Sequence, residues 1–224
     1  MLGTIVNTAT ILAGSAIGIA AGPRLPERVK EILMQGLGLS VFFVGMSMAL
    51  KTQNALLTVG CVLLGGLVGE LLRIEYWLER VGERLKKAFS QDSGTFVDGF
   101  VTATLIYLVG AMTIVGCIED GIANRPETLY IKALLDGVAS LVLASKLGIG
   151  VAFSAVSVFV FQGALTLAAS HLLFMQRPDV LAAVNSTGGV LIMGIAFILL
   201  EIKRIHTGNL LPAVVFGILG ALWL

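Results

Sequence analysis

The amino-acid sequence predicts an all-α, polytopic membrane protein with about eight transmembrane helices. Hydrophobic residues make up 57% of the 224 residues and charged residues only 13%, about half the charged share of a typical soluble domain. A soluble fold of this length has too little interior to bury so much apolar surface, so the excess must face lipid. The net charge of +1, without a basic face or tail, argues against a nucleic-acid partner.

Long apolar stretches define the expected spans, because about 20 apolar residues are needed to cross the hydrocarbon core. Seven stretches are clear: 2–22, 32–50, 53–70, 99–118, 148–173, 180–200 and 207–224. Segment 128–146 contains Lys132 and Asp136, but apolar residues dominate it, and it is counted as the eighth span. The first charged side chain is Arg24, so the opening run lacks the basic region of a cleaved signal peptide and is expected to span.

The distribution of basic residues predicts the orientation. With eight spans and the N-terminus outside, eleven lysines and arginines fall on the cytoplasmic side and four on the outside. This bias follows the positive-inside rule, so both termini are expected outside. Glycines at four-residue spacing indicate close packing of helices in lipid; they are Gly14, Gly18 and Gly22 in the first span and Gly65 and Gly69 in the third.

The chain is expected to form a single integral membrane domain, 1–224, in three parts. A first helical repeat (1–72) precedes an amphipathic helix and linker (73–95), and a second helical part (96–224) follows. Apolar residues recur in the middle part at three- and four-residue steps: Ile74, Trp77, Leu78, Val81, Leu85 and Phe89. Charged residues fill the other face, which predicts a helix lying at the cytoplasmic interface or, alternatively, one that binds a partner.

The first three and last three spans share a weak sequence repeat. FFVGMSMAL (42–50) aligns with LIMGIAFIL (191–199), so that Gly45 matches Gly194. Asn54 then matches Asn209. The two sets of spans begin on opposite sides of the membrane, so the repeat would be inverted, an architecture common in secondary transporters.

Asp136 is the leading candidate for a functional group, because charges inside a membrane are costly and are usually kept for a purpose. Lys132 lies one helical turn before it, and Ser140 one turn after it on the same face. A carboxylate in such surroundings binds a proton or a cation. The alternative is a structural ion pair between Asp136 and Lys132.

Uncharged polar residues inside other spans are further candidates. The run Asn185, Ser186, Thr187 and two glycines contains few helix-forming residues, which indicates either an unwound, ligand-facing segment or a tight helix crossing. Asn7 and Gln162 lie inside the first and sixth spans, where hydrogen bonds between helices would also explain them. These residues, with Asp136, Lys132 and Ser140, form the expected ion or substrate pathway.

The sequence contains no HExxH, GxSxG, Walker or CxxC motif, so no enzymatic activity and no cofactor are expected. Cys61 and Cys117 are isolated in apolar runs. His171 and His206 fall on opposite faces of the membrane in the expected topology, so no metal site is expected.

Several stretches resemble one bacterial family. VGAMTIVGCIEDGI and LYIKALLDGVASLVLASKLGIGVAFSAVSVFVFQGALTL, with GTIVNTATILAG, NSTGGVLIMGI and NLLPA, are similar to the YdfK/YqgA family (domain of unknown function 554). The resemblance implies residence in the bacterial cytoplasmic membrane and assigns neither an activity nor a catalytic residue. It places Lys132, Asp136, Ser140 and Gln162 in family-like motifs. Cys117 departs from the pattern, where a small hydroxyl residue is expected.

Two functions remain open. The first is a transporter-like or channel-like protein for a small ion or solute. The alternative is a non-transporting scaffold, sensor or assembly factor that acts through its cytoplasmic amphipathic helix. In either case the thin bundle of short helices predicts a homo-oligomer embedded in the lipid bilayer.

Overall fold

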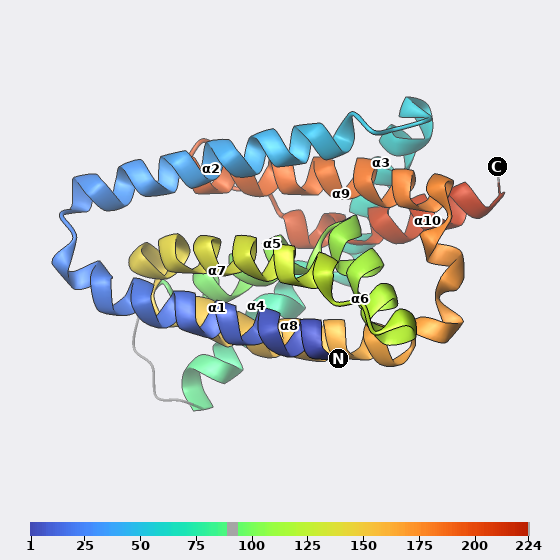
Figure 1. The fold of residues 1–224 in the computed structure, drawn as a ribbon. Coiled ribbons are helices and arrows are strands. Elements are labelled where there is room, and N and C mark those ends of the chain that lie inside the picture. Colours follow the sequence, from blue (N-terminus) through green and yellow to red (C-terminus); the bar gives the residue numbers. More distant parts are fainter. Residues whose placement is uncertain (89–93, 224) are drawn as a thin grey trace.

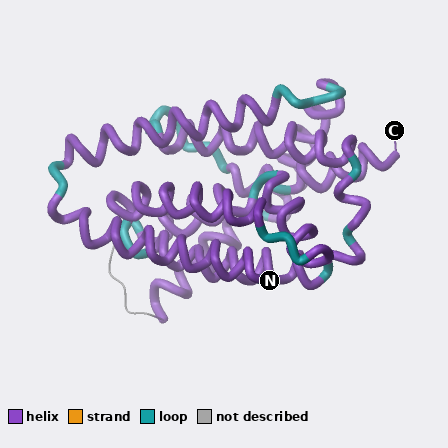
Figure 2. Tube along the Cα trace, in the orientation of Figure 1, coloured by secondary structure: helices purple, strands orange, loops and turns teal. Residues whose placement is uncertain are grey.

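The computed structural model describes residues 1–88 and 94–223, and every regular element in that part of the chain is a helix (Figures 1 and 2). The α-helices are α1 (Leu2–Ala21), α2 (Glu27–Ala49), α3 (Ala55–Leu72), α4 (Ile74–Ala88), α5 (Phe96–Leu108), α6 (Ala111–Ala123), α7 (Glu127–Leu147), α8 (Gly150–Leu167), α9 (Pro178–Leu199) and α10 (Pro212–Trp223). Short 3-10 helices are η1 (Gly22–Arg24), η2 (Ala169–His171), η3 (Leu173–Gln176) and η4 (Thr207–Leu210).

The all-α, polytopic class is confirmed. Six helices of the described chain are long and apolar enough to span a membrane, namely α1 with η1, α2, α3, α7, α8 and α9. The expected span 99–118 is divided between α5 and α6, which meet at a bend of 63° and add a seventh span if counted as one. The last expected span, 207–224, contains η4 and the short apolar helix α10. The eight expected spans are thus six full-length helices, one bent pair and one short helix.

The bend between α5 and α6 comes from two residues. Val109 is extended, with φ −82° and ψ 122°. Gly110 has φ +138°, a conformation that side-chain-bearing residues rarely adopt. The Thr113 hydroxyl donates a hydrogen bond to the Tyr107 carbonyl oxygen (3.2 Å), which satisfies one acceptor left free where α5 ends. The chain therefore turns inside an apolar stretch without proline or charge.

The spanning helices form two groups in contact. In the first group, α1 packs on α7 and α8, while α5 and α6 pack on α8. In the second group, α2 packs along α9, and α3 along α10 (Figure 1). Glycines permit these contacts, as expected: a Cβ at Gly14 would overlap the Gly137 carbonyl, and one at Gly65 would overlap the Ala213 backbone. α2 and α9 run antiparallel, since Gly45 meets Gly189 and Gly38 meets Leu199 and Leu200.

The amphipathic helix is confirmed as α4. One side packs on α5, where Gly82 contacts Phe100 and Val97. The other side exposes Tyr76 and Trp77. Only part of the expected apolar face of α4 therefore packs against the bundle, and the other part is exposed. Phe89, which the sequence pattern included in this helix, lies outside the described residues.

Candidate functional site

The centre of the first helical group holds a buried ion pair on α7. The Lys132 Nζ atom lies 2.6 Å from Asp136 Oδ2, and both side chains are 7% exposed. The spacing of four residues places the two groups on one face of the helix. Asn7 of α1 donates a hydrogen bond from Nδ2 to the same carboxylate oxygen (3.0 Å). The pair is thus bound within α7 and also joined to α1.

A second polar contact lies one helical turn further along α7. The hydroxyls of Tyr107 and Ser140 are 2.7 Å apart, and both side chains are fully buried. The Lys132 Nζ atom lies 6.0 Å from the centre of the Tyr107 ring, within the range of a cation–π interaction. Sequence reasoning missed Tyr107, because nothing in the spacing of α5 links it to α7.

Gln162 of α8 is fully buried, and neither its Nε2 nor its Oε1 atom has a hydrogen-bond partner among the described residues. The Oδ1 atom of Asn7 is also without a partner in that part of the chain. The neighbouring turns of α8 and α1 are joined by the hydroxyls of Thr166 and Thr4, which are 3.4 Å apart. Gln162 and Asn7 each lie one turn further into the bundle from that contact.

Asp120 of α6 is a second buried carboxylate. Its Oδ2 atom lies 2.8 Å from the Met1 amine and accepts a hydrogen bond from the Gly3 amide (3.1 Å). Its side chain has no exposed surface. In the sequence Asp120 forms an acidic cluster with Glu119 and Glu127, for which two interpretations are open: a cluster that draws cations toward a mouth, or a solvated loop. The burial of its side chain excludes the solvated loop for Asp120. Its partners are more than 115 residues away in the sequence, so local pattern gave no signal.

The second helical group contains a cavity of about 370 Å³, called here the hydroxyl cavity. It is lined by residues of α3, α9, α10 and the turn before α3, including Thr52, Asn54, Thr58, Arg177, Asp179, Ser186 and Thr187. The Thr58 hydroxyl donates to Ser186 Oγ (3.0 Å) and lies 2.8 Å from the Thr52 hydroxyl. The cavity therefore presents a row of hydroxyl groups beside one arginine and one aspartate.

The run 185–189 is regular helix. The hydroxyls of Ser186 and Thr187 donate to the Ala183 carbonyl, at 3.1 and 2.7 Å, and the α-helical assignment of α9 is continuous. The unwound segment considered from the sequence is thus not what the structure shows. Gly188 and Gly189 instead allow close crossings, because a Cβ at Gly189 would overlap the backbone of Gly45 and Ala49.

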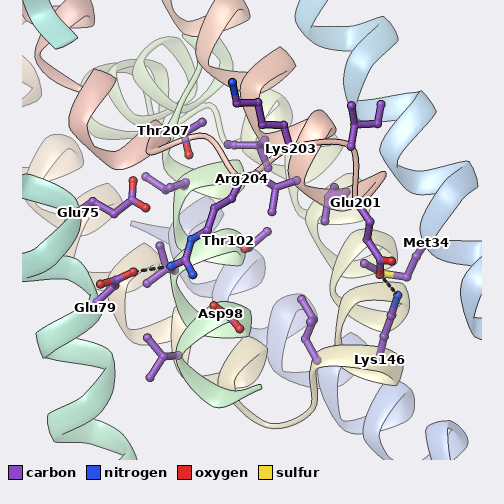
Figure 3. Close-up of a pocket in the computed structure, with 18 residues that line it drawn as sticks. Met34, Glu75, Glu79, Asp98, Thr102, Lys146, Glu201, Lys203, Arg204 and Thr207 are labelled. Atoms are coloured by element: carbon purple, nitrogen blue, oxygen red, sulfur yellow. Dashed lines mark hydrogen bonds and ion pairs between the residues drawn. The ribbon is translucent and has the colours of Figure 1, made fainter. Parts of the chain in front are cut away.

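A larger cavity of about 460 Å³, called here the charged cavity, lies where α4, α5, α7 and α9 meet the segment 201–207 (Figure 3). Two ion pairs border it, Arg204 with Glu79 (2.7 Å) and Lys146 with Glu201 (2.5 Å). The hydrogen bond from Lys146 lowers the pKa of the Glu201 carboxyl. The remaining lining combines Asp98 and Lys203 with apolar side chains such as Leu105, Ile195 and Leu199.

The two cavities lie toward opposite ends of α9. The hydroxyl cavity touches this helix between Asp179 and Thr187, and the charged cavity touches it between Ile195 and Leu199. Between them lie Leu191, which is fully buried, and Gly188, which is buried. A Cβ on Gly188 would lie 3.2 Å from the Val109 side chain and 4.0 Å from the Gly110 nitrogen. The break between α5 and α6 is therefore packed on the part of α9 that separates the cavities.

The structure joins four of the expected site residues in one buried cluster. They are Asn7, Lys132, Asp136 and Ser140, and Gln162 lies in the same helical group. Ser186 and Thr187 belong to the other group, where they line the hydroxyl cavity; Asn185 is half-buried and outside that lining. Neither Asp136 nor Gln162 lines either of the two cavities. The expected pathway is thus divided between two places.

No group of three or more histidine, cysteine or acidic side chains within the described residues could hold a metal ion. Cys61 and Cys117 are both free and buried. The chemical groups in the buried cluster and the two cavities include carboxylates, ammonium and guanidinium groups, amides and hydroxyls. Such groups exchange protons and bind small polar solutes.

The fold and the buried polar cluster define the chain as a multi-pass helical membrane protein. A family model described as a protein of unknown function (DUF554) matches residues 2–222. The chain belongs to this family. It is 30% identical over 217 residues to the "Uncharacterized membrane protein YdfK" of Bacillus subtilis (strain 168), covering 95% of this chain and 92% of that protein.

A second relative is the "Uncharacterized protein YqgA" of Escherichia coli (strain K12). It is 25% identical over 229 residues, which cover 100% of this chain and 97% of that protein. No solved structure matches the chain at a significant level. The resemblance to the YdfK/YqgA family expected from the sequence is confirmed.

Proposed function

We propose that the protein moves a small ion or solute across the bacterial cytoplasmic membrane by exposing a site alternately to its two sides. The observation that carries this proposal is the pair of cavities at opposite ends of α9, divided by a packed layer. The layer spans Thr187 to Ile195, which at 1.5 Å per residue is about 12 Å of helix. A barrier of that thickness is short enough for a modest helix movement to open.

The helix break at Val109 and Gly110 supplies the movable element. Broken helices at membrane depth occur where backbone is buried in protein or lines a cavity, and they are common at transporter sites. Here the break lies against Gly188, in the dividing layer itself. A change of φ and ψ at Gly110 would shift α6 relative to α5 and so change the packing on α9. Gly110 tolerates such a change, because glycine has the widest choice of backbone conformations.

The pairing of helices supports an inverted repeat of α1–α3 and α8–α10. α2 packs antiparallel on α9, its counterpart in the repeat. α3 packs antiparallel on α10, since Gly65 meets Ala213 and Gly220 meets Leu57. A two-fold axis in the membrane plane would place each helix of one repeat antiparallel to its counterpart in the other repeat, as these two helix pairs are placed.

Basic residues support the orientation of the two cavities. Lys146, Lys203 and Arg204 border the charged cavity, and Arg24 and Arg73 end helices at the same end of the bundle. From the positive-inside rule we expect that end to face the cytoplasm. The hydroxyl cavity and both chain termini then face the outside. Volumes of about 370 and 460 Å³ limit the solute to a small molecule or hydrated ion.

Cysteine accessibility tests this proposal without knowledge of the solute. In a background with Cys61→Ala and Cys117→Ala, Ser186→Cys reports on the hydroxyl cavity and Thr102→Cys on the charged cavity. A membrane-impermeant thiol reagent is applied to right-side-out and to inside-out vesicles. Ser186→Cys should react from the outside only, and Thr102→Cys from the inside only.

Leu191→Cys is the matched control for the dividing layer, because Leu191 is fully buried between the cavities. It should react from neither side in the closed bundle. Reaction of Ser186→Cys and Thr102→Cys from one and the same side would refute the proposed arrangement. Reaction of Leu191→Cys at a rate similar to the other two would favour a continuous channel over a carrier.

A second candidate function is favoured by α4, which leaves Tyr76 and Trp77 exposed while Glu75 binds it to the segment before α10. The Glu75 carboxylate contacts His206 Nδ1 (3.0 Å) and the Gly208 amide (3.1 Å). A firmly held helix with an exposed aromatic pair suits a scaffold or sensor. A stable protein complex that is lost on Trp77→Ala, with unchanged cysteine accessibility of both cavities, would favour this function.

A further inference from the structure

The buried polar side-chain atoms without partners among the described residues all lie in the first helical group. Six such atoms are found among the described residues: Asn7 Oδ1, Ser15 Oγ, Thr104 Oγ1, Asp120 Oδ1, Gln162 Nε2 and Gln162 Oε1. All belong to α1, α5, α6 and α8, and within the described chain α2, α3, α9 and α10 contribute none. Buried polar groups in proteins are nearly always hydrogen-bonded. Six in one helical group therefore favour partners other than the polypeptide.

These atoms follow the length of the bundle in order. Asp120 lies at one end, beside Met1. The contact between Thr4 and Thr166 marks the next level. α1 and α8 run antiparallel, so Asn7, one turn on from Thr4, lies level with Gln162, one turn back from Thr166.

The order continues toward the end that carries Lys146. Asn7 binds Asp136, and the pair of Tyr107 and Ser140 follows one turn along α7. Ser15 and Thr104 complete the series. Ser15 lies two turns past Asn7 on α1, and Thr104 lies about one turn before Tyr107 on α5. Thr104 is next in the chain to Leu105, which lines the charged cavity. The series thus leads from Asp120 to the neighbourhood of that cavity.

The charges in this series are balanced, which identifies the missing partner. Lys132 neutralises Asp136, and the Met1 amine neutralises Asp120. A resident metal ion would therefore gain little net attraction. The unpartnered atoms include an amide donor and two hydroxyls as well as acceptors. Water offers donors and acceptors together, whereas a metal ion satisfies acceptors only.

We infer that a file of water molecules occupies this series and carries protons to and from Asp136, so that the proton is the coupling ion. The inference rests on the proposed transport function and adds its driving ion. A hydronium ion in the file gives its proton to the Asp136 carboxylate, which leaves water and a neutral carboxylic acid; release is the reverse step. The hydroxyls of Ser140 and Tyr107 extend the route beyond Asp136.

Protonation of Asp136 changes contacts on two helices. The groups facing it are Lys132 on its own helix and Asn7 on α1, with Tyr107 of α5 within cation–π distance of Lys132. The neutral acid weakens the hydrogen bond from Asn7 and leaves the Lys132 charge without its partner. The contact between α1 and α7 at this level therefore depends on the proton, which couples the proton to helix packing.

Infrared difference spectroscopy of the protein reconstituted in lipid tests the inference without a transported solute. A step to acid pH should produce carboxylic-acid carbonyl bands that shift in D2O, because all accessible acidic side chains take up protons. One of these bands, the Asp136 band, should be missing from Asp136→Asn. In Gln162→Met the band should appear at least tenfold more slowly, because methionine has a similar size and removes both unpartnered amide atoms of the file. Gln35→Met is the control, since Gln35 is exposed on α2, outside the file; its kinetics should equal those of wild type.

An Asp136→Asn spectrum that keeps every carbonyl band of wild type would overturn the assignment of the proton acceptor. Equal kinetics in Gln162→Met and wild type would overturn the water file, and this second variant keeps the inference testable if Asp136→Asn does not fold. Either result leaves the two-sided cysteine labelling of the cavities unchanged. Loss of that labelling with intact infrared kinetics would refute the proposed transport arrangement instead, so the two failures are distinguishable.

Discussion

Replacement of Asp136 by alanine should destabilise the protein far more than removal of the whole ion pair. The Lys132 ammonium is 7% exposed and has the Asp136 carboxylate as its ion-pair partner. In Asp136→Ala this charge stays in the bundle without compensation. The double variant Lys132→Met/Asp136→Leu removes both charges and replaces them with apolar side chains of similar volume.

The magnitude follows from the burial of both partners. Stranding one member of a buried ion pair costs about 3–5 kcal/mol. The Nδ2 donor of Asn7 also loses its acceptor, which adds about 1–3 kcal/mol. Asp136→Ala should therefore lower the free energy of unfolding by about 4–8 kcal/mol. Replacing a buried pair by apolar residues is often nearly neutral, so the double variant should differ from wild type by only the Asn7 contribution of about 1–3 kcal/mol.

Reversible unfolding in mixed micelles, followed by far-ultraviolet circular dichroism, measures both variants against wild type. The single variant Lys132→Met completes the cycle and gives the coupling energy of the pair. An Asp136→Ala loss no larger than that of the double variant would refute the reasoning. It would mean that Lys132 leaves the bundle or is uncharged there, and that the pair contributes nothing to the fold.

Three further predictions concern other contacts. Gly189→Leu should destabilise by about 3 kcal/mol or more in the same unfolding assay, because its side chain would overlap Gly45 and Ala49, whereas Gly36→Leu, with nothing within 4 Å of its Cβ, should be neutral. Lys146→Met should return the lowered pKa of the Glu201 carboxyl to its ordinary value. The ion pair of Lys146 and Glu201 stabilises the fold at pH values above the ordinary glutamate pKa. This stabilisation is lost as the pH falls through the lowered pKa of Glu201, so the melting temperatures of Lys146→Met and wild type should converge in acid. Asn209→Ala should speed amide hydrogen exchange in the first turn of α4, because Asn209 accepts from the Glu75 amide at 2.7 Å.

The fold class follows from composition because lipid imposes a simple rule. Apolar runs of span length without compensating polar residues can be buried only in a bilayer, and there the backbone must be helical. The same rule identified α7 in spite of Lys132 and Asp136, since the rest of its surface is apolar. The amphipathic pattern of α4 was equally readable, because charged and apolar residues separate at helical spacing.

The break between α5 and α6 could not be read in the same way. A single glycine in an apolar run is tolerated in a membrane helix, and YLVGAMTIV contains neither proline nor charge. Gly110 has a positive φ, and Gly188 and Met48 lie against the turn that it forms. Those contacts join helices distant in the sequence, so they exist only in the folded protein.

The candidate site was predictable in part for the same reason. Asp136 and Lys132 are neighbours on one helix, and their pairing followed from spacing alone. Asn7 was identified as a buried amide, but its contact with Asp136 joins residues 129 positions apart. Tyr107 was missed, and Asp120 was considered only as a member of an acidic cluster, because the partner of each lies on another helix. The spacing of residues in the sequence therefore identifies polar groups inside membrane helices. The partners of these groups on other helices can be identified only from the folded structure.

The double variant also separates a structural role of the ion pair from a role in proton transfer. Lys132→Met/Asp136→Leu keeps the bundle closely packed and removes the only carboxylate of α7 beyond its first turn. If the pair serves packing alone, this variant should show the infrared response of wild type, because the band would then arise elsewhere. If Asp136 accepts the proton, the band should be lost while the free energy of unfolding stays within about 3 kcal/mol of wild type. The infrared response of this one variant therefore differs between the two roles, while its free energy of unfolding shows that the bundle is still folded. A variant that keeps both the band and the stability would assign the pair to packing.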